Sequence, residues 1–275
     1  MKEPSLSAES IPSNSEQSKD ASFIISYFDK IKVAPDIHPE AGDFSAVFDD
    51  IEYRQHCFEE IKKSFLLIYD KNKVNAAISS KPNEDSFIYL KQVRRIGLIL
   101  RESYLLFSSE HSSPQPFYLF IKSLGGFNDQ YWFSAPKELG EKVAERNIGN
   151  FEFNDPSIEN KDFRKYVEKI LSDTKELLKE QILSMEEFHG LRKNIRLCAD
   201  IMQVSAAEDY QGKLHWLFSS LLDLSVRLGK EHDEYIQRDL KGEINYKKTK
   251  VEVDPYVVEN FNKLRPFIKK VMGIM

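Results

Sequence analysis

The sequence has no long apolar run and little cysteine. No segment reaches the roughly 18 consecutive apolar residues that a helix needs to cross a bilayer, and the N-terminus lacks the basic start and apolar stretch of a signal peptide. The two cysteines, Cys57 and Cys198, are too far apart to give a metal-ligand spacing, and both lie among apolar residues. We therefore expect a cytoplasmic protein without a membrane span, in which both thiols are buried and reduced.

Basic charge is not in excess either. The net charge is −5 over 275 residues, which argues against a general attraction between the protein and a polyanion. Residues 1–50 hold four Lys and ten Asp or Glu, whereas the rest of the chain is nearly neutral. Any affinity for phosphate must therefore come from a local basic patch.

The N-terminal segment differs from the rest in composition. Residues 1–21 are rich in Ser and poor in large apolar side chains, so they cannot bury enough surface to offset their ordering entropy. Apolar residues return between 22 and 48, where Pro and Gly interrupt any long helix. We expect residues 1–50 to be an acidic, partly disordered leader, with a short part that packs onto the body.

Glycine-rich signatures are missing as well. The sequence has no Walker loop, no dinucleotide-binding fingerprint and no nucleophile elbow, and its strand signals are confined to 243–253. Helix starts are marked by Ser184 with Glu187 and by Asp254 before Pro255. Apolar periodicity predicts helices at 51–80, 85–108, 114–125, 127–147, 158–182, 185–204, 208–228, 230–241 and 254–272.

Two local patterns occur twice. FIYLKQVRRI at 87–96 aligns without a gap with FHGLRKNIRL at 188–197, and LGGFND at 124–129 aligns with LGKEHD at 228–233. The two offsets, 101 and 104, differ by only three residues, which favours a tandem duplication. We expect an all-α fold in which two pseudo-symmetric four-helix units, 51–150 and 151–275, form one helical-bundle domain.

Basic residues form a stripe in each copy. In the second copy the stripe covers an arc of about 100° opposite an apolar face, and no acid follows Glu187 along it. A single stripe of this kind is also typical of a solvated helix face. Its repetition favours a groove between the copies, in which Arg forks grip phosphate oxygens. The stripe residues are Lys91, Arg94, Arg95 and Arg101 in the first copy and His189, Arg192, Lys193 and Arg196 in the second.

The LGKEHD and LGGFND segments predict helix corners. Gly229 and Gly125 would end a helix by taking positive φ, and Asp233 and Asp129 would cap the next one. Two further residues of the second segment could face the same ligand as the stripes. They are Lys230 and His232.

The pairing of FHGLRKNIR with LGKEHDEYIQRDL resembles the second half of a CHAD domain, the conserved-histidine α-helical domain, and YLKQVRR with LGGFNDQYW resembles its first half. The resemblance covers about residues 51–272. It implies two related four-helix units that bind inorganic polyphosphate without catalysis, in the cytoplasm or at polyphosphate granules. It also implies that the binding residues are Lys91, Arg94, Arg95, His189, Arg192, Lys193 and Arg196.

Other functions stay open. Ile88 stands where the second copy has His189, so one alternative is a protein-interaction scaffold that has lost polyphosphate binding. His232 followed by Asp233 is also found in metal-dependent HD phosphohydrolases, but the sequence does not show the further ligands that this chemistry needs. Aromatic residues do not interleave with the stripes, so nucleic acid would bind only unspecifically. We expect no cofactor and no enzyme activity.

Overall fold

The computed structural model of the chain describes residues 39–79, 84–133, 149, 151–154, 159–208 and 212–274. This part of the chain is mostly helical, which confirms the all-α class. The helices are α2 (Ile51–Ile68), α3 (Lys71–Ser79), α4 (Glu84–Phe107), α5 (Gln115–Phe133), α7 (Asn160–Lys179), α8 (Met185–Glu208), α9 (Lys213–Leu240) and α10 (Pro255–Val271). Short 3₁₀ turns are η1 (Ala41–Asp43), η2 (Val47–Asp49) and η3 (Tyr246–Lys248), and the strands are β1 (Ile182–Ser184) and β2 (Lys250–Glu252).

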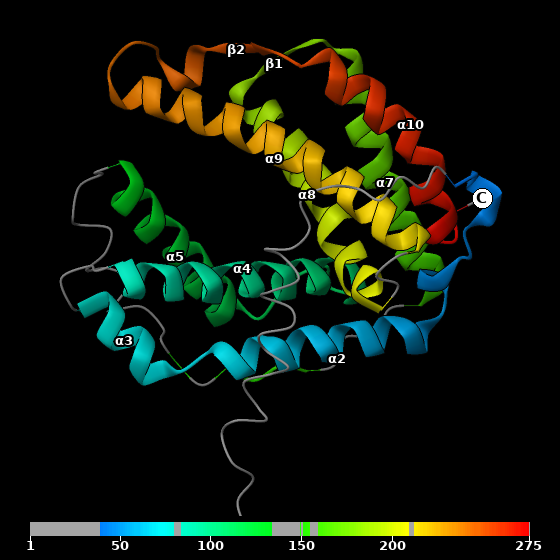
Figure 1. Cartoon of the computed structure of the whole chain (residues 1–275), viewed down its shortest axis with the longest axis horizontal. Coiled ribbons are helices and arrows are strands. Elements are labelled where there is room, and N and C mark those ends of the chain that lie inside the picture. The colour runs from blue at the N-terminus through cyan, green and yellow to red at the C-terminus, as the bar shows by residue number, and fades with distance from the viewer. Residues whose placement is uncertain are drawn as a thin grey trace, which may run out of the picture.

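The helices gather into two groups that meet where α8 contacts α4 (Figure 1). The first group contains α2–α5, and the second contains α7–α10 with the small sheet. Helix α8 packs along α9 within its own group and contacts α2 and α4 of the other. Side chains on α8 can therefore meet side chains on α4. No helix in the described ranges combines the length and the apolar character that a membrane span requires.

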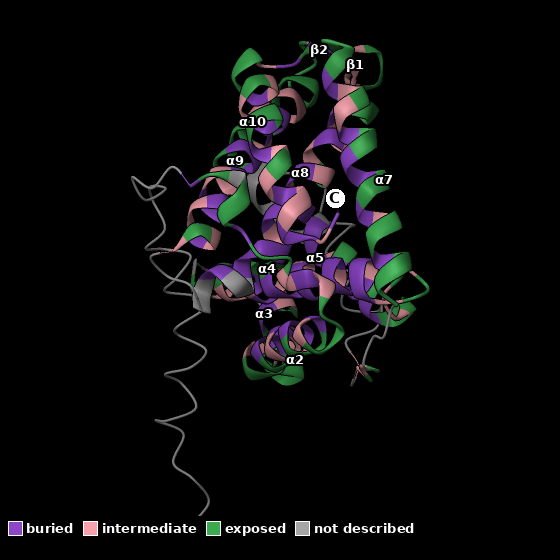
Figure 2. Ribbon diagram, turned by 90° about the vertical axis from the view of Figure 1, so that its right-hand side faces the viewer, coloured by how far each residue is buried: buried purple, intermediate pink, exposed green. Residues whose placement is uncertain are grey.

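The apolar face predicted for α8 is buried. Its side chains lie in a core shared by both helix groups, and Figure 2 shows buried residues along the described helices of both groups. Each fully buried Leu, Ile or Phe contributes about 1.5–3 kcal/mol from the removal of apolar surface from water. This burial fixes which face of α8 remains for polar side chains. The buried residues of that face are Phe188, Leu191, Ile195, Cys198, Ile201 and Met202. Both cysteines are buried and free, as expected.

The last part of the leader belongs to the folded body. Phe44 and Phe48 are buried, and the ring of Phe44 lies 5.4 Å from that of Phe267 in an edge-to-face contact. Arg54, itself buried, donates from Nη1 to the Phe48 carbonyl at 2.7 Å and from Nη2 to Asn160 Oδ1 at 2.9 Å. These contacts tie η2 to α2 and α7. The disorder predicted near the N-terminus falls on residues outside the described ranges.

The predicted helix starts are confirmed. Ser184 Oγ accepts a hydrogen bond from the Glu187 backbone N–H at 3.3 Å, and Glu187 Oε2 accepts one from the Ser184 N–H at 2.7 Å, which is a capping box. Asp254 Oδ1 accepts from the Tyr256 N–H at 2.9 Å at the start of α10. The segment expected to allow extended structure contains β2, which pairs antiparallel with β1 so that Leu183 lies opposite Val251.

Three predicted boundaries are wrong. The helix expected at 51–80 is divided, because Asp70 Oδ1 accepts from the N–H groups of Asn72 and Lys73 and starts α3. Helices α5 and α9 run through Gly125 and Gly229, where corners were expected. Among described glycines, positive φ occurs only at Gly242 and Gly273, so Gly125 and Gly229 do not end a helix in that way. Asp233 consequently lies inside α9, and the side chain of Asp129 is outside the described part.

A close approach explains the glycine in each helix. A Cβ atom at Gly229 would lie 3.7 Å from Arg192 Nε, and one at Gly125 would lie 3.2 Å from Arg94 Nη2. Each glycine therefore receives the guanidinium group of a neighbouring helix against its backbone. The small residue serves packing between helices and not a change of chain direction.

Candidate functional site

The four stripe residues of α8 lie on one face, as the spacing predicts. Lys193 is exposed, whereas His189, Arg192 and Arg196 are half-buried. Burial, and then the nearby positive charges of Lys193, Arg192 and Arg196, lower the pKa of His189 to about 4. His189 is therefore neutral at physiological pH and adds hydrogen-bonding capacity to the stripe, not charge.

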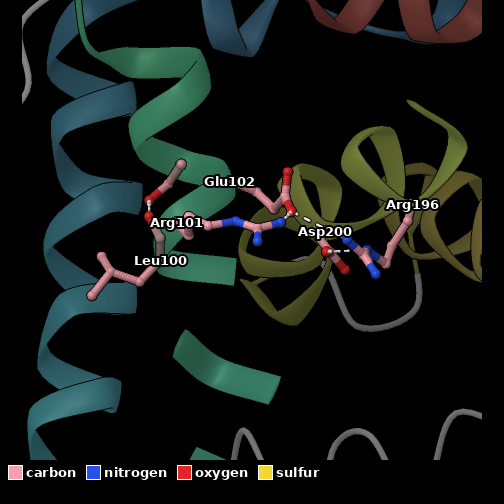
Figure 3. A network of polar contacts seen from close by, with 6 residues as sticks. Leu100, Arg101, Glu102, Arg196 and Asp200 are labelled. Carbon is pink, nitrogen blue, oxygen red and sulfur yellow. Dashed lines mark hydrogen bonds and ion pairs between the residues drawn. The ribbon is translucent and has the colours of Figure 1, made fainter. Parts of the chain in front are cut away.

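Where α8 meets α4, charged side chains of both helices come together in what we call the seam. The seam consists of Arg95, Arg101 and Glu102 from α4 and Lys193, Arg196 and Asp200 from α8. Glu102 is at its centre and is only 5% exposed. Its Oε1 accepts a hydrogen bond from Arg101 Nη2 and another from Arg196 Nη2 at 3.2 Å (Figure 3). One carboxylate thus holds two guanidinium groups, one from each helix.

Asp200 is the second acid of the seam. Its Oδ2 lies 3.7 Å from Arg196 Nε, an ion-pair distance that is too long for a hydrogen bond. Burial raises the pKa of Asp200 to about 7, against the opposing effect of Arg196, and the negative charge of Glu102 adds to the rise. Lys193 has a lowered pKa, first because part of its side chain is shielded from water, although much of it is exposed, and then because of Arg101 and Arg196.

The seam keeps a surplus of positive charge. Arg101, Lys193 and Arg196 share only two acids, and Asp200 is close to half-protonated at neutral pH. The prediction that no acid shares the α8 stripe is wrong, because Asp200 follows Arg196 by one helical turn and pairs with it. Two half-buried guanidinium groups without an acceptor would carry a desolvation cost, which explains the acids.

A second cluster joins α8, α9 and η3. Arg192 Nη1 donates to His232 Nδ1 at 3.1 Å, and His232 Nε2 lies 2.9 Å from the Tyr246 hydroxyl. Because Arg can only donate, His232 accepts at Nδ1 and carries its proton on Nε2. The His189 and His232 rings lie 5.1 Å apart between centroids. Among described residues, the buried Nδ1 of His189 has no hydrogen-bond partner.

Not all predicted site residues reach these clusters. Arg94 packs on Gly125 of α5, and Lys91 is exposed three positions earlier on α4. Lys230 lies two positions from His232, and therefore on the opposite side of α9. It is exposed and lines an outer groove with acidic neighbours such as Glu231 and Glu234. The structure thus separates Lys230 from His232, which the sequence had grouped.

The contacts of His232 also bear on the metal alternative. Both of its ring nitrogens are engaged, one by Arg192 and one by Tyr246, so a metal ion would have to displace one of them. Within the described ranges, no group of three or more His, Cys, Asp or Glu side chains is placed to hold a metal ion. Asp233 Oδ1 lies 3.4 Å from His232 Nδ1 and is half-exposed.

Three site residues were not selected from the sequence. Glu102 and Asp200 could have been found from the sequence, because Glu102 directly follows Arg101 and Asp200 lies one helical turn beyond Arg196. Tyr246 reaches His232 from η3, 14 residues further along the chain, and only the folded structure could reveal the contact.

Comparison of the chain with protein-family models, with curated proteins and with solved structures found no match. The resemblance to the CHAD family therefore stays a prediction.

Proposed function

We propose that the protein binds inorganic polyphosphate, or a similar polyanion, without catalysis and in the cytoplasm. The observation that carries the proposal is the positive surplus of the seam, where cations from two helices converge although the chain as a whole is acidic. Such convergence is unfavourable in the free protein because like charges repel. A bound polyanion would remove this repulsion and release its own counterions.

The α8 stripe extends the seam toward the second cluster. Lys193 lies next to Arg192, and His189 follows one turn away with its buried Nδ1 unpaired among described residues. A chain of phosphates could follow this face from Arg101 to His189, gripped by planar guanidinium forks and by a point charge at Lys193. Lys91 and Arg94 on α4 belong to the same proposal if the two helix groups are related units, as the repeated patterns and the CHAD resemblance imply.

The test is a titration of the full chain with polyphosphate of defined length across a salt series. We expect affinity to fall steeply between about 50 and 200 mM salt, because several phosphate contacts release counterions. Lys193→Ala should weaken binding and reduce the slope of log affinity against log salt by about one. Lys193 is exposed and suits the test, since its loss also relieves repulsion with Arg101 and Arg196 and should not impair folding.

Lys230→Ala is the matched control, since it removes the same charge from the opposite side of α9. We expect its affinity to equal that of the wild type. Absence of polyphosphate binding at low salt would refute the function. Equal losses of affinity from Lys193→Ala and Lys230→Ala would refute the location of the binding site at the seam.

A further inference from the structure

A cavity of about 430 Å³ opens at one end of the seam, between α4, α5, α7 and α8. Its volume lies within the range of pockets that hold small ligands. The walls include Arg101, Glu102 and Lys193 of the seam, where Glu102 is already engaged by Arg101 and Arg196, and they continue into apolar and aromatic residues that the seam itself lacks. The cavity therefore differs in character from the open, cationic face of α8.

The end of the cavity near the seam suits an anion. Arg101 and Lys193 both line it, and partial burial, followed by the positive charge of Arg101, lowers the pKa of Lys193. The buried Nε of Arg101 has no hydrogen-bond partner among described residues. Ser112 and Ser113 add hydroxyl groups to the same cavity just before α5 begins. A phosphate group placed here would neutralise two cations that repel each other in the free protein.

The remaining wall suits a flat, largely apolar group. Leu105, Leu197 and the two tyrosines Tyr118 and Tyr166 line it. The ring of Tyr166 is stacked on that of His111 at 3.9 Å with an interplanar angle of 11°.

His111 is itself held in place, since its Nδ1 hydrogen-bonds to the Leu105 carbonyl at 2.7 Å. The Tyr166 side of the wall is thus fixed before a ligand arrives, which lowers the entropy cost of binding.

We propose that this cavity binds a phosphomonoester that carries a planar ring, such as a nucleoside monophosphate. The phosphate would lie against Arg101 and Lys193, and the ring against Tyr118 and Tyr166. Inorganic polyphosphate has no apolar part and would gain nothing from the leucines and tyrosines. The proposal shares two cations with the polyanion site, but it rests on the cavity and its aromatic wall and does not depend on that function.

The experiment titrates the full chain with adenosine monophosphate, with adenosine and with inorganic phosphate, separately and at low salt. We expect the nucleotide to bind at least about tenfold more tightly than either fragment, because only the nucleotide reaches both ends of the cavity. Equal affinity for the nucleotide and for inorganic phosphate would overturn the proposal.

Ser113→Trp tests the location by filling the cavity without changing its charge. We expect it to reduce nucleotide affinity at least about tenfold and to leave polyphosphate affinity unchanged. Ser109→Trp, an exposed change in the same connection that does not line the cavity, is the control and should bind the nucleotide normally. Unchanged nucleotide binding by Ser113→Trp would refute the location.

A second variant covers misfolding of Ser113→Trp. Tyr118 is 37% exposed, so Tyr118→Ala should fold, and we expect it to weaken nucleotide binding about tenfold through loss of stacking. An unchanged affinity would contradict the role of the aromatic wall. Loss of polyphosphate binding in Arg192→Ala with nucleotide binding intact would support the separate nucleotide site, since Arg192 does not line the cavity.

Discussion

Substitution of Asp200 tests how the seam responds to negative charge. The pKa of its carboxyl group is raised to about 7 by burial, so the group is mostly ionised near pH 8.5 and mostly protonated near pH 5.5. Asp200→Asn keeps the shape of the side chain and is neutral at both pH values. We expect the variant to bind polyphosphate more tightly than the wild type near pH 8.5 and equally near pH 5.5.

The size of this effect follows from the geometry of the ion pair. Asp200 Oδ2 lies 3.7 Å from Arg196 Nε. A phosphate on the far side of that guanidinium group would be roughly 8 Å from the carboxylate, where two unit charges repel by about 2 kcal/mol at an effective dielectric constant near 20. Mobile ions screen this to roughly 1 kcal/mol, because the Debye length at physiological ionic strength is about 8 Å. The expected gain in affinity is therefore about fivefold.

The assay is a calorimetric titration of both proteins with the same polyphosphate at the two pH values. Because both proteins bind the same polyphosphate at each pH, the ratio of their affinities does not depend on how far the ligand itself is protonated. Asp223→Asn is the control, because Asp223 is exposed on α9 and pairs with Arg227 at 3.0 Å. Its ratio should stay near one. A ratio for Asp200→Asn that does not change with pH would refute the placement of the polyanion beside Arg196.

Two further predictions concern stability. Gly190→Ala should raise the free energy of unfolding by about 0.5–1 kcal/mol, because a Cβ atom there meets nothing within 4 Å. Gly97→Ala should lower the free energy of unfolding, because its Cβ atom would lie 2.2 Å from Ile121 Cδ1. Urea unfolding of both variants measures the difference, and equal shifts would contradict the packing around α4. The folded pKa of His189 is about 4, below the ordinary histidine value of 6.5, so the folded protein binds fewer protons between these pH values and its stability rises with pH across that window. His189→Gln should remove up to about 3 kcal/mol of this rise, and a variant with the same pH profile as the wild type would disprove the assignment.

Local signals predicted much of the fold. The apolar face of α8 was predicted because helical periodicity alone decides which residues can be buried together. The capping box at Ser184 and the cap at Asp254 were predicted because each depends only on residues two or three positions away. The site residues His189, Arg192, Lys193 and Arg196 share a face for the same reason, so their grouping could be predicted without knowledge of the tertiary fold.

The glycine corners could not be decided locally. Gly229 is compatible with a helix end and equally with a close contact inside a helix, because the absence of a Cβ permits both. The deciding factor is the guanidinium group of Arg192, which belongs to another helix. The same holds for Gly125 and Arg94. Once α9 runs unbroken through Gly229, Lys230 and His232 must face opposite sides, and the grouping of these two residues fails as a direct consequence.

The two acids of the seam were not predicted, because the site residues were chosen from the sequence by their basic side chains. Glu102 directly follows Arg101, and Asp200 lies at the i+4 position from Arg196, where helical side chains meet. The pairing of Glu102 with Arg196, however, crosses from α4 to α8 and depends on the contact between the two helix groups. Sequence spacing could suggest that Arg196 has an acidic neighbour, but not that one carboxylate joins two helices.

Arg54 shows what a purely structural arginine looks like in this protein. It is 2% exposed, donates hydrogen bonds to the Phe48 carbonyl and to the Asn160 side chain, and has the carboxylates of Asp49 and Asp50 nearby to oppose the effect of its burial. In the seam, by contrast, Arg101 and Arg196 share one carboxylate, and Lys193 adds a further positive charge that lacks an acid of its own there. Packing alone does not require that added charge, since an uncharged side chain would remove the repulsion. The surplus therefore supports the proposed site for an anion that comes from outside the chain.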